Sequence, residues 1–141
     1  MNSAKQMEEN TEQKNLSNML ILLVEDNISN QKVASRYMEK WGATVDLAEN
    51  GIICLEKINS RDYDLILMDL QMPEMDGYTA AAEIRKLNEP KFKSIPIIAL
   101  TASAFLDTKA KVLEAGMTNY ISKPFVPEEL YQILKEYYKK K

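Results

Sequence analysis

Asp64-Leu-Ile-Leu-Met-Asp69 places four consecutive apolar residues between two aspartates in the middle of the sequence. An unbroken apolar run of this length is typical of a parallel strand covered by helices on both faces, and we expect this one at the centre of its sheet. Four other runs have the length of strands: Met19–Val24, Thr44–Leu47, Ile95–Leu100 and Asn119–Ser122. The second and last of the five, in chain order, are more polar, which favours positions nearer a sheet edge.

Between these runs, apolar residues recur at spacings of three and four, the period of a helix that buries one face. The apolar positions of the five predicted helices are Val33, Tyr37, Met38 and Trp41; Ile52, Leu55 and Ile58; Ala81, Ile84 and Leu87; Leu106, Ala110 and Leu113; and Leu130, Ile133, Leu134 and Tyr137. Gly42 and Gly116 follow the first and fourth of them, where a left-handed residue commonly ends a helix. Met72-Pro-Glu-Met-Asp-Gly77 predicts a turn before the third, in which Gly77 relieves the backbone. The alternation predicts an α/β fold with a five-stranded parallel sheet, doubly wound as (βα)5 in three αβα layers.

The composition fits one domain, since the chain has 141 residues and 45% of them are hydrophobic. We expect residues 1–18, which are almost uniformly polar, to form a disordered arm or linker, and residues 19–141 to form the domain. The net charge of −3 argues against direct nucleic-acid binding, and no apolar run is long enough to cross a membrane. The single cysteine excludes an internal disulfide. A reducing compartment suits it, so we expect a cytoplasmic protein.

The chain contains no histidine. This excludes Ser-His-Asp hydrolases, His-ligated zinc sites and kinases that phosphorylate their own histidine. Any chemistry therefore depends on carboxylates, lysines, hydroxyl groups and a bound metal.

Polar side chains follow four of the predicted strands, at the ends where ligands bind in open parallel sheets. Glu25 and Asp26 follow the first strand, Asp69 the third, Thr101 the fourth and Lys123 the fifth. An ionised carboxylate after a buried strand needs compensating charge, and acids that crowd together repel one another unless a cation lies between them. Mg²⁺ takes oxygen ligands and leaves room for water and phosphate oxygens. The pattern therefore predicts a metal site rather than an acid–base pair.

Each of these residues also has a purely structural interpretation. Glu25 and Asp26 could be a helix N-cap and its solvated neighbour, and Thr101 could cap the fourth helix. Lys123 could be a surface lysine, as most lysines are. Tyr120 is expected to be partly buried, and the sequence favours neither a structural nor a switching role for it.

Motifs that span Met19 to the C-terminus resemble the receiver domain of two-component response regulators. They are Ile21-Leu-Leu-Val-Glu-Asp-Asn27, Asn30-Gln-Lys-Val33, Val45-Asp-Leu-Ala-Glu-Asn-Gly51, Tyr63-Asp-Leu-Ile-Leu-Met-Asp-Leu-Gln-Met-Pro-Glu-Met-Asp-Gly77, Ile97-Ile-Ala-Leu-Thr-Ala102, Ala115-Gly-Met117 and Tyr120-Ile-Ser-Lys-Pro-Phe125. Asn30-Gln-Lys-Val33, Gln71 and Leu100-Thr-Ala-Ser-Ala104 are most similar to receivers attached to hybrid sensor histidine kinases. The resemblance implies a flavodoxin-like fold and a phosphoacceptor role in two-component phosphorelay signal transduction.

Carried over by position, the resemblance implies that Asp69 is the residue that becomes an aspartyl phosphate. Asp26, Asp69 and the backbone carbonyl of Gln71 would ligate Mg²⁺, with Mn²⁺ as the other candidate. Glu25 would hold the metal mainly through water.

The resemblance also implies how the phosphoryl group is sensed. Lys123 would contact it, Thr101 would move toward it and Tyr120 would change rotamer. A cis peptide bond between Lys123 and Pro124 is expected as well.

A histidine kinase or a histidine phosphotransfer protein is the implied phosphoryl donor, and a phosphorylation-dependent homodimer is one implied output. Direct contact with nucleic acid or membrane is not expected. The receiver would not itself be an enzyme, although a hybrid sensor kinase that contained it would be a kinase.

Two other functions compete with a phosphorylation switch. One is a phosphorylation-independent docking module of the same fold, although such modules usually lose the acceptor or the lysine. The other is a Mg²⁺-dependent phosphohydrolase, which would need a carboxylate two residues after its nucleophile, where this sequence has Gln71.

Overall fold

The computed structural model describes residues 14–102 and 107–139. Its single five-stranded sheet has the order β2-β1-β3-β4-β5, and all four pairings are parallel. The strands are β1 (Leu20–Val24), β2 (Thr44–Ala48), β3 (Leu65–Asp69), β4 (Ile97–Thr101) and β5 (Asn119–Ser122). The predicted central position of the 64–69 run and the predicted edge positions of the second and fifth runs are confirmed.

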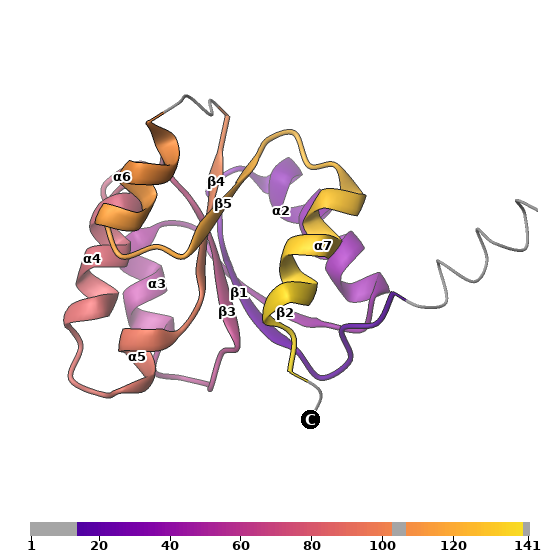
Figure 1. Cartoon of the computed structure of the whole chain (residues 1–141), viewed down its shortest axis with the longest axis horizontal. Coiled ribbons are helices and arrows are strands. Elements are labelled where there is room, and N and C mark those ends of the chain that lie inside the picture. The colour runs from indigo at the N-terminus through magenta and orange to yellow at the C-terminus, as the bar shows by residue number, and fades with distance from the viewer. Residues whose placement is uncertain (1–13, 103–106, 140–141) are drawn as a thin grey trace, which may run out of the picture.

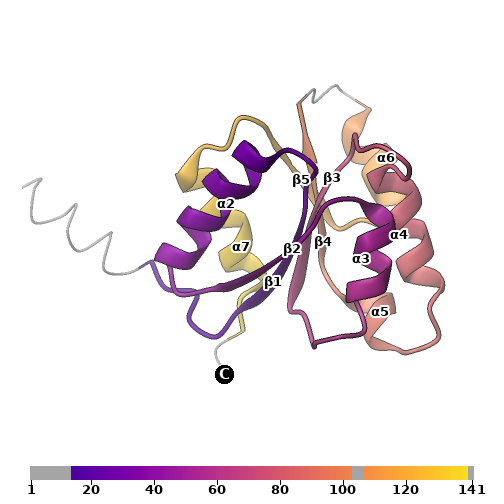
Figure 2. The ribbon, with the colours of Figure 1, turned by 180° about the vertical axis from the view of Figure 1, so that it is seen from behind.

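Helices cover both faces of this sheet, as Figures 1 and 2 show. On one face lie α2 (Ile28–Lys40) and α7 (Pro127–Tyr137); on the other lie α3 (Gly51–Lys57), α4 (Gly77–Lys86), α5 (Lys91–Ser94) and α6 (Thr108–Glu114). Successive strand residues point to opposite faces, so Leu23 and Leu67 join the α2/α7 core while Leu22 and Ile66 join the other. Burial on both sides explains why the central strands are unbroken apolar runs.

Three predicted helical faces are partly wrong. Val33, Ile52 and Leu113 were assigned to buried stripes, yet they are 44%, 40% and 52% exposed. In α6 the buried positions are Thr108 and Val112 instead, and Leu106 lies outside the described residues. Apolar residues on adjacent stripes give two phases that both fit the helical period, and packing on the sheet selects one. The four-residue helix α5 was not predicted, because so short a segment carries no period.

The packed chain begins earlier than the predicted boundary at residue 19. Leu16 has no exposed surface and belongs to the α2/α7 core, and its amide donates to the carbonyl of Trp41 at 2.6 Å. The Tyr138 hydroxyl donates to the carbonyl of Ser17 at 2.9 Å. Residues 14–18 therefore pack on α2 and α7 rather than forming part of an arm, and residues 1–13 lie outside the described part of the chain.

Within the two described segments, no helix combines the length and the apolarity that a bilayer crossing requires.

Cys54 is expected to resist alkylation while the chain is folded. Its side chain is fully buried in α3, and this burial raises the pKa of the thiol from 9.0 to about 12. The thiolate is the reactive form, so at neutral pH its population falls about a thousandfold. We expect iodoacetamide to label the native chain far more slowly than the chain in denaturant. Equal labelling rates in the two states would contradict this burial.

Candidate metal and phosphoryl site at the sheet edge

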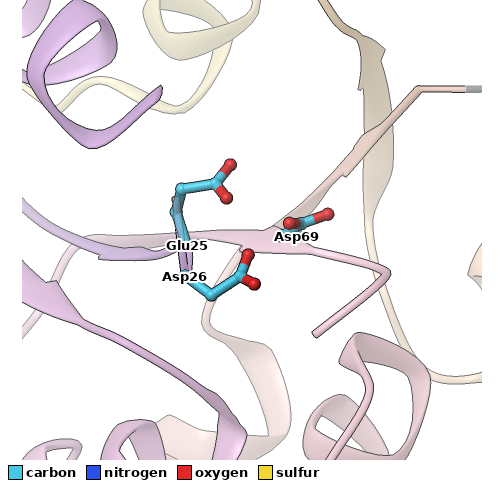
Figure 3. Close-up of side chains that lie close together, drawn as sticks. All are labelled: Glu25, Asp26 and Asp69. Carbon is cyan, nitrogen blue, oxygen red and sulfur yellow. The ribbon is translucent and has the colours of Figure 1, made fainter. Parts of the chain in front are cut away.

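Three carboxylates from two neighbouring strands meet at the carboxyl ends of those strands, which we call the sheet edge of the site. Val24 pairs with Met68 in the β1–β3 ladder, so Glu25 and Asp26 leave β1 beside the end of β3, where Asp69 lies. One oxygen of each of the three carboxylates lies within 4.8 Å of the others, and Figure 3 shows the side chains gathered there. Glu25 is 1% exposed and Asp69 is 4% exposed, whereas Asp26 is exposed. The structure thus brings the predicted acids together.

Lys123 supplies a positive charge to this group. Its Nζ lies 3.0 Å from Glu25 Oε1 and 3.3 Å from Asp69 Oδ2. One ammonium is thus shared by the two buried acids, so Lys123 is not a surface lysine. The predicted cis peptide bond between Lys123 and Pro124 is confirmed.

Burial and charge shift the pKa values of the paired groups. Burial raises the pKa of Glu25; the Asn27 amide and Lys123 lower it in part, while the charge of Asp69 raises it. For Lys123, burial favours the neutral form, but hydrogen bonds and charge from Glu25 and Asp69 outweigh this and raise its pKa. The ammonium is therefore held firmly charged between the two carboxylates.

The acidic pair does not cap the helix that follows it. The N-cap of α2 is Asn27, whose side chain accepts from the Asn30 amide at 2.9 Å. Glu25 instead accepts from the Asn27 amide at 3.1 Å through Oε2. The capping interpretation of Glu25 and Asp26 is therefore wrong, and both carboxylates face the sheet edge with Asp69.

Thr101 lies on β4, the neighbour of β3, and Tyr120 lies on β5, one strand further out. Asp69 pairs with Leu100, so Thr101 ends β4 next to the acidic group, and it is 7% exposed. Thr101 is not the N-cap of α6, which is Asp107, so that interpretation is also wrong. Tyr120 is half-buried on β5, as predicted. The backbone amide of Lys123 donates to the Thr101 carbonyl at 2.8 Å, which links the two strand ends.

Gln71 and Gly77 shape the backbone around Asp69. The Gln71 amide donates to Asp69 Oδ1 at 3.2 Å, while the predicted role of the Gln71 carbonyl as a metal ligand stays a prediction. Gly77 was expected to relieve a turn, but the left-handed residue of that turn is Glu74, with φ of 70°. Gly77 is instead required by close approach, because a Cβ there would lie 2.3 Å from the Asp69 carbonyl oxygen.

Gly77→Ala should therefore lower the free energy of unfolding by about 3 kcal/mol, because the added methyl group meets backbone that cannot move without displacing Asp69. Gly51→Ala is the matched control. Gly51 also follows an N-cap residue and is buried, but its Cβ would meet only side chains, those of Met75 at 3.0 Å and Ala80 at 3.1 Å, which a shift of a few tenths of an ångström relieves. We expect a cost of about 1 kcal/mol or less there. Denaturant unfolding measures both, and equal costs would contradict the argument.

A family comparison agrees with this geometry. The family model described as the response regulator receiver domain matches residues 21–135, most of the chain. The chain belongs to the response regulator receiver family. Its fold and its function in two-component phosphorelay signalling follow from that membership, and the resemblance noted from the sequence is confirmed.

Three related proteins place this receiver among known ones. It is 42% identical over 122 residues to histidine protein kinase 1 of Candida albicans, a match that covers 81% of this chain and 5% of that protein. The receiver domain of sensor histidine kinase PA1611 from Pseudomonas aeruginosa, solved with magnesium coordinated in its active-site cleft, is 41% identical with a TM-score of 0.76, covering 84% of this chain and 96% of that one. The receiver domain of Ssk1 from Saccharomyces cerevisiae, solved with the histidine phosphotransfer protein Ypd1, gives 29% identity and a TM-score of 0.78, covering 87% and 90%. The receiver thus spans only a small part of the kinase that it matches.

The donor atoms of this receiver suit a hard divalent cation. All three acids offer carboxylate oxygens, which are the ligands that Mg²⁺ prefers. Their spacing allows them to surround one ion, directly or through bound water, and a single ammonium leaves an excess of negative charge when they are ionised. The residues present therefore fit the metal that the family implies.

Proposed function

We propose that Asp69 of this receiver accepts a phosphoryl group from a phosphohistidine donor, in a reaction that requires Mg²⁺ or Mn²⁺. The observation that supports this most strongly is the group of three carboxylates within 4.8 Å, two of them buried, with Lys123 between Glu25 and Asp69. Such an arrangement costs stability unless a cation shares it. It also leaves the Lys123 ammonium beside Asp69, where negative charge of the phosphoryl group would develop. The donor would supply the histidine that this chain lacks.

Asp26 and Asp69, with the Gln71 carbonyl, would hold the metal directly, and Glu25 would hold it mainly through water. When bound, the metal would neutralise charge on the transferring phosphoryl oxygens. Asp69 would attack through a carboxylate oxygen that the Gln71 amide orients. Lys123, already 3.3 Å from Asp69, would donate to a phosphoryl oxygen.

Phosphorylation would then bias an equilibrium between two conformers. Thr101 would turn its hydroxyl toward the phosphoryl group, and Tyr120 would turn inward. An open pocket of about 370 Å³ lies beside Tyr120, lined by residues of β5 and α7 and by Lys109 of α6, and it leaves room for movement there. A change from mostly off to mostly on requires about 5 kcal/mol of differential stabilisation. The surface of α6, β5 and α7 would carry the output, and a phosphorylation-dependent homodimer is one form of it.

The donor would be a histidine kinase or a histidine phosphotransfer protein, the class to which Ypd1 in the Ssk1 receiver complex belongs. Two exposed apolar residues flank the acidic group in sequence. Ile28, 65% exposed, begins α2 just after Glu25 to Asn27, and Val126, 48% exposed, is the N-cap of α7 soon after Lys123. Apolar anchors beside a charged centre suit a transient protein contact.

We further propose that the receiver acts in the cytoplasm, as a module of a hybrid sensor kinase or as a separate regulator, and that it is not itself an enzyme. The domain would comprise the packed segment that begins near residue 14, rather than at residue 19.

Incubation with a small acyl phosphate, with and without Mg²⁺, distinguishes this function from its two rivals. A receiver gains one hydroxylamine-labile phosphate per chain, and only when Mg²⁺ is present. A phosphorylation-independent docking module gains none, and a phosphohydrolase releases phosphate catalytically. Either of the last two results would overturn the proposal.

A further inference from the structure

Gln31 is a buried polar residue that none of these roles uses. It lies on α2, is 9% exposed, and shares the buried face of that helix with Ala34 and Met38. Its side-chain Nε2 donates to the backbone carbonyl of Glu25 at 2.6 Å. A buried amide is costly unless it is paired, so this bond is the reason why a glutamine can occupy the position.

The bond closes the turn between β1 and α2. The Glu25 amide donates to the Ala48 carbonyl at 3.0 Å, which extends the β1–β2 ladder by one residue. The Gln31 amide donates to the Asn27 carbonyl at 2.9 Å, which is the first hydrogen bond of α2. Glu25 is therefore held on both sides: its amide, in the Val24–Glu25 peptide, is bonded to the sheet, and its carbonyl, in the Glu25–Asp26 peptide, is bonded to the helix through Gln31.

Asp26 depends on this turn more than the other two acids do. The Asn27 amide and Lys123 hold the carboxylate of Glu25, and the Gln71 amide and Lys123 hold that of Asp69. Across residues 14–102 and 107–139, no hydrogen bond or ion pair holds the carboxylate of Asp26. Its place within 4.8 Å of the other two is therefore set by the backbone that carries it.

We infer that Gln31 is a positioning residue for the metal site, which acts by fixing the Glu25 peptide so that the Asp26 carboxylate meets Asp69. The inference rests on the proposed metal site. Without the side-chain amide, the Glu25 carbonyl loses a buried partner and the peptide can rotate, which turns Asp26 away from the other two acids. Groups that orient metal ligands typically contribute about 10–100-fold to metal affinity.

Isothermal titration calorimetry with MgCl₂ tests this on the whole chain, with Gln31→Met as the variant. Methionine keeps the length and volume of the side chain but cannot donate. We expect the Kd for Mg²⁺ to rise about tenfold or more, at a temperature at which both chains are folded. The matched control is Gln132→Met, the same change at an exposed position on α7, which should leave the Kd unchanged.

The melting temperature separates positioning from a merely structural role. If Gln31 has only a structural role, Gln31→Met will have a lower melting temperature but a Kd for Mg²⁺ within twofold of that of the unaltered chain. That result would overturn the inference. Absence of Mg²⁺ binding by the unaltered chain would overturn the metal site itself, and the inference with it.

Two further measurements apply if Gln31→Met does not fold. Gln31→Asn keeps the amide but shortens the side chain by one methylene group, and it should also weaken Mg²⁺ binding. In the unaltered chain, the side-chain NH₂ resonances of Gln31 should shift on addition of Mg²⁺ with the Kd found by calorimetry. Resonances that do not move at saturation would contradict the coupling.

Discussion

The Asp69→Asn chain will take up no labile phosphate under conditions that phosphorylate the unaltered chain. Asparagine keeps the shape of the side chain, but its amide oxygen is too weak a nucleophile to form an acyl phosphate. Asp69 is 4% exposed at the end of the central strand, so its position in the site is set by that strand. Intact-mass spectrometry after incubation with an acyl phosphate and Mg²⁺ measures the uptake. Mg²⁺ should also stabilise this variant less against unfolding, since one of three carboxylates is lost.

Asp76→Asn is the matched control for this result. Asp76 caps α4 by accepting from the Thr79 amide at 2.8 Å, and asparagine caps a helix about as well. The control chain should take up phosphate as the unaltered chain does. If Asp69→Asn still took up a phosphate that is labile to hydroxylamine and requires Mg²⁺, Asp69 would not be the acceptor.

Lys123→Met will slow phosphoryl uptake by about a hundredfold or more, because one donor aimed at the developing negative charge is lost. The same change should lower the unfolding free energy of the metal-free chain at neutral pH by about 2 kcal/mol, since Glu25 and Asp69 are left buried without their ammonium. We place this cost below the roughly 3–5 kcal/mol of a fully buried ion pair, because the Lys123 side chain is 15% exposed and solvent screens it in part.

The stability loss in Lys123→Met should depend on pH in a definite direction. Burial already raises the pKa of Glu25 above 4.5, so the folded chain binds that proton more tightly than the unfolded chain does. The stability that protonated Glu25 contributes is lost as the pH rises through the pKa of the folded state. Removal of Lys123 enlarges this loss of stability, because the ionised carboxylate is then left without its ammonium. Lowering the pH toward 4.5 should therefore reduce the deficit, as should Mg²⁺ at neutral pH.

Lys86→Met is the control for charge removal, because Lys86 is largely exposed and, among the described residues, forms an ion pair only with Glu83 in the preceding turn. It should change neither phosphoryl uptake nor the pH dependence. A deficit in Lys123→Met that stays constant from neutral pH down to 4.5 would contradict the electrostatic explanation.

Most of the fold could be predicted because strands covered on both faces leave a strong signal. The unbroken run before Asp69 indicated the central strand, and the mixed runs at 44–47 and 119–122 indicated the two edges. The phase of the helices was harder to predict. In α6, Leu113 is exposed and Val112 is buried. The sequence could not distinguish them, because the two adjacent apolar residues fit the helical period equally well and only packing on the sheet decides which one is buried.

The members of the site could be predicted because the carboxyl ends of all strands of a parallel sheet lie on the same side, which brings Glu25, Asp26 and Asp69 together. The links between them could not be predicted from the strand ends. That Lys123 lies closer to Glu25 than to Asp69 depends on side-chain conformations across three strands. The bond from Gln31 to the Glu25 carbonyl was missed because Gln31 lies in a helix, away from the strand ends, and a polar residue on a helix normally indicates a solvated face.

The most direct test is to trap the phosphorylated residue chemically. The chain is incubated with an acyl phosphate and Mg²⁺, reduced with borohydride, which converts an aspartyl phosphate to homoserine, and sequenced by tandem mass spectrometry. We predict homoserine at position 69 and at no other position, and none when Mg²⁺ is withheld. Homoserine at position 26, or none in the complete reaction, would contradict the assignment of Asp69 as the phosphoacceptor.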